Sequence, residues 1–335
     1  MGRCFSNNAD RQIFICHEFH HHCEWVGRML TTLSSDAKIK HPRLKVIGVG
    51  GAGCNILLDS HFENIAICTS NDHVRQIPES KRLVIDEKHL SILQGTNPRT
   101  LASIDYQLKE MIQEAIGESE ILYICAGLGG ETGTYVAPAI AHICRRMSDF
   151  IVMSLALPFS VEGRDRRNLA SRGLLNALHA SDVVIVYEND RLLRAAPHLP
   201  LYNAFRLMDE VMLFPALALE RAITMEDLYE LRAMFSSFKH AVFCMGTAVS
   251  SQEHLALYNA LDSPWCDYSI EKVGAVLLII SSEKIDDFLI KRISEEAKRK
   301  LPKASIKCVC YADPSLRGKV RVAALLGTPP QATSQ

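Results

Sequence analysis

The chain has 335 residues, 48% of them hydrophobic and 22% charged, which is enough apolar material for two domains or for one large domain with an appendage. Its formal net charge is -1, so the sequence lacks the strong basic field that would mark nucleic acid as a partner. No apolar run reaches the roughly 18 to 20 residues that a membrane-spanning helix needs, and we expect no direct membrane insertion.

The 11 cysteines are scattered along the chain, and their number is odd. We interpret those inside apolar runs as reduced core residues, which are typical of a reducing compartment. They are Cys68, Cys125, Cys144, Cys308 and Cys310. Because the first residues also lack the apolar stretch and cleavage site of a secretory signal, the sequence predicts a cytoplasmic protein.

Residues 1–41 are rich in His and Cys and carry few strand signals, so we expect a loose extension and a folded body that begins at Pro42. Short apolar runs then alternate with helix-like stretches. We expect strands at 44–49, 64–68, 82–85, 121–125, 150–157 and 183–187, and helices at 100–116, 136–147 and 167–179. This alternation predicts an α/β domain with a parallel sheet covered on both faces.

The second half of the chain has a different pattern. A long helix is expected at 201–222, with Pro215 kinking or interrupting it. Strands follow at 241–245, 273–280, 306–311 and 320–326, with a helix at 284–301. We therefore predict an α/β domain at 42–200, a central helical segment at 201–235, a smaller α+β domain at 236–328 and a loose tail at 329–335.

The first predicted strand runs directly into a glycine cluster at 48–55. Glycine lets the backbone approach an anion closely, and the following helix offers free N–H groups and the positive end of its dipole. Gly48, Gly50 and Gly53 also match the G-x-G-x-x-G fingerprint of dinucleotide-binding domains, with Asn71 and Asp72 about 20 residues farther on. At this point an NAD-dependent oxidoreductase is an open alternative.

A second glycine-rich loop, at 126–134, follows the strand predicted at 121–125. A dinucleotide domain does not need this second loop. A triphosphate benefits from two loops that wrap it from both sides, because backbone amides and threonine hydroxyls can donate hydrogen bonds to its phosphate oxygens. The pair of loops therefore favours a nucleoside triphosphate.

Here the sequence resembles the tubulin/FtsZ family of GTPases. The stretch KVIGVGGAGCN resembles the first phosphate loop of FtsZ, and AGLGGETGTYVAP resembles the family signature GGGTG[ST]G. The resemblance covers about residues 43–328. It implies the tubulin/FtsZ fold: a Rossmann-like GTP-binding domain at 42–200, a central helix with an acidic hydrolysis loop at 201–235, and an α+β C-terminal domain. It also implies GTP or GDP as the bound nucleotide.

The resemblance assigns roles to residues beyond the two loops. Glu162 and Arg166 would contact the ribose, Asn189 would read guanine, and Phe205 would stack on the base. Glu210, with Asp209 as its neighbour, would accept hydrogen bonds from guanine, whose partner groups are donors. The implied nucleotide-binding residues are Gly50, Gly51, Ala52, Gly53, Asn55, Asn71, Gly129, Gly130, Glu131, Thr132, Gly133, Thr134, Glu162, Arg166, Asn189, Phe205 and Glu210.

In this family one subunit binds GTP and an acidic loop of the next subunit completes the site, so hydrolysis accompanies filament assembly. Asp227 and Glu230 take the places of the two catalytic acids. Three features depart from the family. Met225 replaces a usual Asn, the stretch before Asp227 is shorter than in typical FtsZ, and Glu131 replaces a glycine of the phosphate loop. A carboxylate there repels phosphate unless it points away or helps to hold a cation such as Mg²⁺.

Structural interpretations of the same residues remain open. Glu162 and Arg166 are spaced as a surface helix pair, and Phe205 could be a core residue. Asp227 and Glu230 could be ordinary first-turn acids of a helix capped by Thr224. The run at 16–23 contains the H-E-x-x-H pattern of zinc proteases, but a His-rich run produces this pattern easily. Adventitious metal binding by Cys16, His20, His21 and Cys23 is an alternative, but we expect a disordered extension here and predict no metal site.

The predicted function is a GTP-binding, FtsZ-like protein that forms head-to-tail filaments with GTP hydrolysis at the subunit interface, in cell division. An alternative is a paralogue that binds GTP without hydrolysing it and regulates a filament former. An NAD-dependent oxidoreductase is the remote alternative. The expected partners are other copies of this chain or another FtsZ-type protein.

Overall fold

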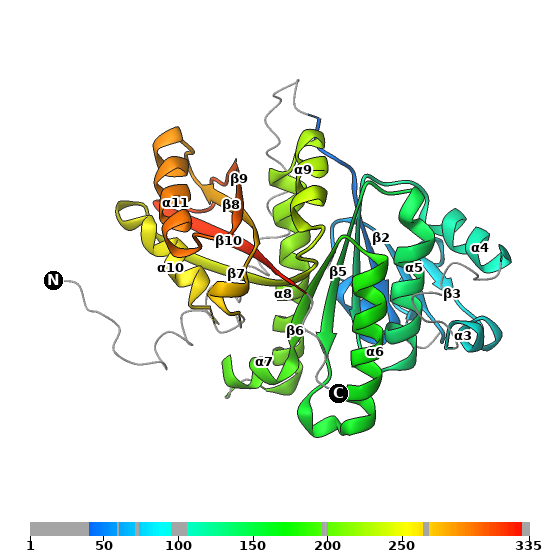
Figure 1. Cartoon of the computed structure of the whole chain (residues 1–335). Coiled ribbons are helices and arrows are strands. Elements are labelled where there is room, and N and C mark those ends of the chain that lie inside the picture. Colours follow the sequence, from blue (N-terminus) through cyan, green and yellow to red (C-terminus); the bar gives the residue numbers. More distant parts are fainter. Residues whose placement is uncertain are drawn as a thin grey trace.

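The structure, a computed structural model, describes residues 40–58, 60–70, 74–94, 106–195, 198, 200–263 and 268–329. In the first half of the chain, the apolar runs form parallel strands in the order β3-β2-β1-β4-β5-β6 (Figure 1). The strands are β1 (Leu44–Val49), β2 (Glu63–Cys68), β3 (Arg82–Val84), β4 (Ile121–Gly127), β5 (Phe150–Leu157) and β6 (Val183–Glu188). The predicted parallel α/β sheet is confirmed, whereas most of the predicted N-terminal extension lies outside the described residues.

Alternate residues of the buried strands face two different cores. Along β4, Tyr123 and Cys125 point to one face of the sheet, while Leu122 and Ile124 point to the other. Because parallel strands are buried on both faces, their sequences are apolar throughout rather than alternating. The first face is covered by α2 (Gly50–Ile56) and the long helix α8 (Leu201–Ala222), and the second by α3 (Glu87–Gln94), α4 (Tyr106–Ile116), α5 (Ala137–Ile143) and α6 (Arg164–Ala180) (Figure 1).

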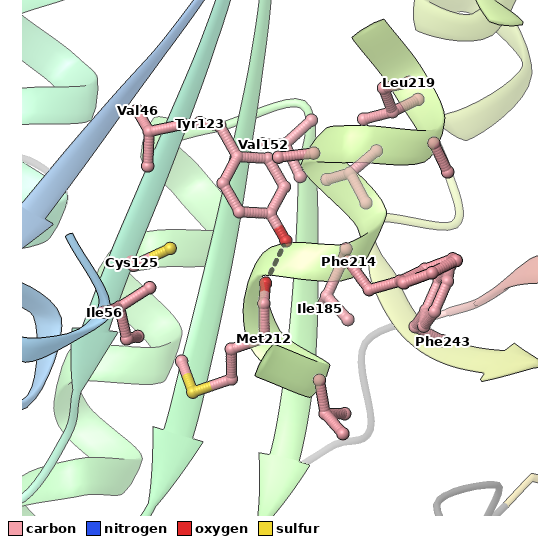
Figure 2. Close-up of a cluster of buried hydrophobic side chains, with 14 of the residues drawn as sticks. Val46, Ile56, Tyr123, Cys125, Val152, Ile185, Met212, Phe214, Leu219 and Phe243 are labelled. Atoms are coloured by element: carbon pink, nitrogen blue, oxygen red, sulfur yellow. Dashed lines mark hydrogen bonds between the residues drawn. The ribbon is translucent and has the colours of Figure 1, made fainter. Parts of the chain in front are cut away.

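Of the two expected effects of Pro215, a kink or an interruption, the interruption is not found, because the central helix α8 continues through Pro215. Proline has no N–H, and the carbonyl of Val211, four residues earlier, therefore loses its helical hydrogen bond. The hydroxyl of Tyr187 donates to that carbonyl oxygen at 3.3 Å. The Tyr123 hydroxyl donates to the carbonyl of Met212 at 2.7 Å (Figure 2). Side chains of the sheet thus satisfy the backbone of the helix where the proline disturbs it.

The second half of the chain extends the same sheet. Strand β7 pairs in parallel with the end of β6, and the order continues β7-β10-β8-β9. Helices α10 and α11 cover one face of these strands, and α8 packs against the other. The elements are α9 (Met225–Phe235), β7 (His240–Val249), α10 (His254–Leu261), β8 (Ala275–Ser282), α11 (Asp287–Lys300), β9 (Ser305–Ala312) and β10 (Lys319–Thr328). The domain boundaries remain a prediction, because the sheet crosses the one at 236 without a break.

The five cysteines interpreted as reduced are all free thiols. Burial raises the pKa of Cys144 to about 12, which keeps this thiol protonated and unreactive. The thiols of Cys308 and Cys310 are only half-buried. Cys244 on β7 differs from these residues, since it is disulfide-bonded. Within the described residues, none of the helices combines the length and apolar character that a membrane span requires.

Candidate functional site

The first glycine loop is a direct passage from β1 into α2, which begins at Gly50. A Cβ placed on Gly53 would lie 2.3 Å from the carbonyl oxygen of Cys125, so only glycine allows α2 to pack this closely on β4. Gly51 is half-buried, while Ala52 and Asn55 are exposed. The sequence therefore brings the amino end of a helix against the carboxyl ends of β1 and β4.

The second glycine loop continues from β4 through Glu131 into a short π-helical turn at Thr132–Val136. A Cβ on Gly133 would lie 2.0 Å from the carbonyl oxygen of Gly127, whereas one on Gly130 would meet no atom within 4 Å. The hydroxyl of Thr134 is fully buried and accepts a hydrogen bond from the Gly129 N–H at 2.9 Å. Thr134 thus braces the loop from inside, while Gly130 borders open space.

The two loops lie side by side because β1 and β4 are neighbouring parallel strands. A Cβ on Gly50 would lie 3.4 Å from the backbone nitrogen of Gly133. Thr69, just after β2, shares a hydrogen bond of 2.8 Å with Thr132 through their hydroxyls. The ends of β2, β1 and β4 therefore meet at one edge, where N–H groups and hydroxyls gather as an anion site requires. Thr69 was not predicted, because nothing local distinguishes it from other residues that follow strands.

Glu131 is exposed on the second loop. An exposed carboxylate is compatible with phosphate binding, because it can turn toward solvent or toward a cation. Among the described residues, no three His, Cys, Asp or Glu side chains gather as a metal site. Asn71, the remaining residue predicted near this edge, lies outside the described residues.

The predicted ribose residues lie on the turn after β5, which holds Glu162, and in the first turn of α6, which holds Arg166. Glu162 accepts a hydrogen bond from the Phe159 N–H at 2.7 Å and forms an ion pair with Arg166, four residues later. The ion pair forms, with the Arg166 side chain 55% exposed, but it is not a pair within one helix, because Glu162 ends a short turn and Arg166 lies in the first turn of α6. The turn also borders the second glycine loop, since a Cβ on Gly129 would lie 3.1 Å from the Arg166 carbonyl oxygen. The surface pair and the loop are therefore parts of one region.

The predicted base-binding residues approach this turn from α7 (Asn189–Ala195) and α8. The rings of Phe205 and Phe159 make an edge-to-face contact with centroids 6.0 Å apart. Phe205 is 42% exposed and is therefore not a core residue. Asp190, next to the half-buried Asn189, accepts a hydrogen bond of 3.0 Å from the Ser160 N–H. The structure thus brings Phe205 and Asn189 to the same turn as Glu162.

Helix geometry favours Asp209 over Glu210 as the acid beside Phe205. Residues four apart lie on one face of a helix, whereas residues five apart are rotated by about 140°. The charge of Asp209 also contributes to raising the pKa of the Cys125 thiol, although burial is the larger cause. Its carboxylate is therefore close to the strand that leads into the second loop. Glu210 stays a prediction, and Asp209 is the alternative acid that the helix geometry favours.

The two predicted catalytic acids lie on α9. The carboxylate of Asp227 accepts hydrogen bonds of 2.8 Å from both the N–H and the hydroxyl of Thr224, and this capping box agrees with the structural interpretation of Asp227 as a first-turn acid. Glu230 lies beyond the first turn. The other oxygen of Asp227 lies 2.7 Å from the ammonium of Lys307 on β9, which also pairs with Glu230. Burial opposes the charge, but bonds from Lys307 and Thr224 hold the pKa of Asp227 below its usual range.

Helix α9 stands at the opposite end of the sheet from the glycine loops (Figure 1). The Met225 N–H bonds to the carbonyl of Lys40, which precedes β1, and Arg232 lies 3.5 Å from the carbonyl of Asp149, which precedes β5. The loops follow the carboxyl ends of the strands instead. β5 alone has 8 residues, and such a strand is roughly 26 Å long. One chain therefore does not bring the acids to its own glycine loops.

Comparison with known proteins gives consistent results along the chain. The model of the Tubulin/FtsZ family GTPase domain matches residues 43–197. Cell division protein FtsZ 1 of Pyrococcus horikoshii is 31% identical over 294 residues, which cover 84% of this chain and 79% of that protein. The FtsZ 1 protein of Methanocaldococcus jannaschii is 29% identical over 295 residues, covering 84% and 81% of the two chains.

Solved structures show the same similarity. The empty FtsZ dimer of M. jannaschii aligns with a TM-score of 0.71 at 26% identity, and the alignment covers 92% of each chain. The GDP-bound monomer of CetZ1 from Haloferax volcanii aligns with a TM-score of 0.69 at 18% identity, covering 85% of this chain and 93% of that one. At 18% identity, the match to CetZ1 shows a shared fold and no more.

Proposed function

Since this chain belongs to the tubulin/FtsZ family of GTPases, we propose that it binds GTP and GDP at the glycine-loop edge of the sheet and assembles head to tail into filaments. In this proposal GTP is hydrolysed at the interface between two subunits, in the cytoplasm and during cell division. The names of its FtsZ relatives support the cell-division role.

The separation of the two half-sites is the observation that carries the proposal. The glycine loops lie at the carboxyl ends of the strands, whereas Asp227 and Glu230 lie on α9 at the amino ends. A second copy that stacks in the same orientation would place its α9 end over the glycine loops of the first. Such a contact joins two different surfaces and therefore repeats into an open polymer rather than closing as a dimer.

Each part of the nucleotide has a chemical counterpart at the glycine-loop edge. Backbone N–H groups and the Thr132 hydroxyl suit phosphate oxygens, and we assign the Glu162–Arg166 pair to the ribose. The exposed Phe205 ring offers a stacking surface, and Asp209 offers the acceptor that guanine needs. The second glycine loop and the family membership argue against the NAD-dependent alternative.

A magnesium ion fits this proposal if it is bound largely through the nucleotide. Mg²⁺ in such sites is held by one or two carboxylates together with substrate phosphates and water. Glu131 is an exposed carboxylate on the second loop and is the candidate protein ligand. When bound, the ion would neutralise charge on the phosphates.

The hydrolysis-deficient alternative keeps a specific observation in its favour. Both oxygens of Asp227 are already engaged within the subunit, by Thr224 and Lys307. A carboxylate held in this way is poorly placed to orient water. The engaged oxygens of Asp227 bear on the rate of GTP hydrolysis and leave nucleotide binding and assembly unaffected.

Two measurements on the purified full chain test the proposal. We expect calorimetry to detect binding of GTP and GDP, with much weaker binding of ATP and none of NAD. We expect GTP-dependent sedimentation above a critical protein concentration, and turnover that rises steeply above the same concentration. Absence of heat with millimolar GTP would refute the nucleotide site. Turnover that is strictly proportional to protein concentration would refute the shared interface.

A further inference from the structure

Lys307 on β9 is a cation beside the predicted catalytic acids, and the sequence around those acids does not predict it. Its ammonium lies 2.7 Å from Asp227 and also pairs with Glu230, although these residues lie far apart in the chain. The Lys307 side chain is only 17% exposed. Despite burial, the two acids raise its pKa, so Lys307 stays positively charged at neutral pH. The acid pair of α9 therefore contains an internal counter-ion.

The three charged groups have different freedom. Asp227 is anchored, because Thr224 and Lys307 occupy both of its oxygens and its side chain is 15% exposed. Within the described part of the chain, Glu230 is anchored only by the ion pair with Lys307, and its side chain is 60% exposed. Asp227 thus fixes Lys307 in place, and Lys307 in turn holds the more exposed Glu230.

We propose that Lys307 restrains GTP hydrolysis by bridging the two carboxylates that would otherwise orient the attacking water. This inference rests on the proposed function and concerns the regulation of the same site. Lys307 acts here through Asp227 and Glu230, so it is a positioning residue.

The restrained reaction is the ordinary hydrolysis of GTP. The oxygen of water forms a bond to the γ-phosphorus, and the bond between that phosphorus and the β–γ bridging oxygen breaks. The electron pair of the broken bond leaves with GDP, one water proton remains on the phosphate, and the other passes to solvent. A carboxylate assists by accepting a hydrogen bond from that water, and an ion pair to lysine makes the carboxylate a weaker acceptor.

The test replaces Lys307 by Met, which has a similar length and no charge. We expect the turnover per assembled subunit of Lys307→Met to rise several-fold above that of the wild type, because both carboxylates regain free oxygens. Lys307→Arg keeps the cation and should stay at the wild-type rate. The double variant Lys307→Met/Glu230→Gln should lose most of the gain, since Glu230, the more exposed of the two released acids, is then missing.

Lys45→Met is the matched control. Lys45 is a comparably buried lysine, with a side chain 12% exposed, and it lies 2.7 Å from a single acid, Glu63. It does not belong to the acid pair, so its replacement should leave turnover per assembled subunit unchanged. Thermal unfolding and sedimentation of every variant show whether it is folded and assembled, and Lys307→Gln is made in parallel in case Lys307→Met does not fold.

Turnover in folded, assembled Lys307→Met and Lys307→Gln that equals or falls below the wild-type rate would overturn the inference. A turnover below the wild-type rate would instead indicate that Lys307 stabilises the charge of the nucleotide phosphates bound to the adjoining subunit. GTP binding and sedimentation of the wild type are measured first. Failure there removes the proposed function, whereas a wild type that binds and assembles, with no faster variant, removes only the role of Lys307.

Discussion

Gly130 and Gly133 are three residues apart in the second glycine loop, yet a methyl group would meet different surroundings at each. At Gly133 a Cβ would lie 2.0 Å from the Gly127 carbonyl oxygen, and at Gly130 it would meet open space. The conformation of the loop therefore depends on one close backbone contact. A substitution that pushes this contact apart must move β4 or the turn that follows it.

We expect Gly133→Ala to lower the free energy of unfolding by about 1–3 kcal/mol, because the added carbon overlaps backbone that has no rotamer to escape into. Gly130→Ala is the matched control and should stay within about 0.5 kcal/mol of the wild type. Urea unfolding measures both. Equal stability of the two variants would mean that the loop is not packed as described.

Asp209 and Glu210 are neighbours on α8, and we propose that Asp209, four residues after Phe205, is the one that would face the base. We expect Asp209→Ala to weaken GTP binding by about 10- to 100-fold, the loss typical of a hydrogen bond to a charged group, which is about 1.5–3 kcal/mol. Glu210→Ala should bind GTP like the wild type. Calorimetry decides between the two acids. A larger loss of GTP affinity in Glu210→Ala than in Asp209→Ala would support Glu210, the acid predicted from the sequence.

At the scale of elements, α8 keeps its helical form through Pro215 because hydroxyl groups of the sheet bond to its carbonyl oxygens. Tyr187 lies on β6 and donates to Val211, whose usual partner would be the N–H of residue 215. The carbonyl that the proline leaves without a helical partner therefore forms a hydrogen bond that links the helix to the sheet. Figure 2 shows the neighbouring bond from Tyr123 to Met212 inside the same apolar cluster.

We expect Tyr187→Phe to destabilise the protein by about 1–3 kcal/mol, because it leaves the buried Val211 carbonyl without a partner. In a Pro215→Ala background the same change should cost clearly less, since the restored N–H of residue 215 can bond to Val211. A double-mutant cycle from denaturant unfolding measures this coupling. Additive effects of the two substitutions would show that the tyrosine does not compensate for the proline.

At the scale of the whole molecule, the two half-sites are separated by the length of the sheet. Each subunit carries both, at opposite ends, so each filament interface would combine the nucleotide of one subunit with the acids of the next. A variant that has lost one half-site should therefore still contribute its intact half-site to the interface with a neighbouring subunit.

Mixing two inactive variants tests this arrangement. We expect Phe205→Ala, which lacks the stacking ring, and Glu230→Ala, which lacks the exposed acid, each to hydrolyse GTP slowly when alone. A mixture should exceed both, because the intact glycine loops of the second variant meet the intact acids of the first. The assay is phosphate release above the critical concentration. A mixture that only averages its components would place both half-sites in one subunit.

Much of the fold was predictable because its signals are local. Apolar runs such as 121–125 specify buried strands, the alternation with helices specifies a parallel sheet, and the glycines at 48–53 and 127–133 specify sharp, close-packed passages from strand to helix. The continuity of α8 through Pro215 was not predictable. It depends on Tyr187, which is close to the proline only in the folded chain.

For the candidate site, the sequence by itself determined which chemical groups exist: two glycine loops, an aromatic residue and acids near the central helix, and an acidic start to α9. Only the tertiary structure decided how they are combined. It brought Thr69 to Thr132, Lys307 to the acid pair, and Asp227 to the end of the sheet far from the glycine loops. The physical reason is that sequence spacing fixes neighbours along one helix or strand, whereas contacts between elements depend on how the whole sheet is ordered and packed.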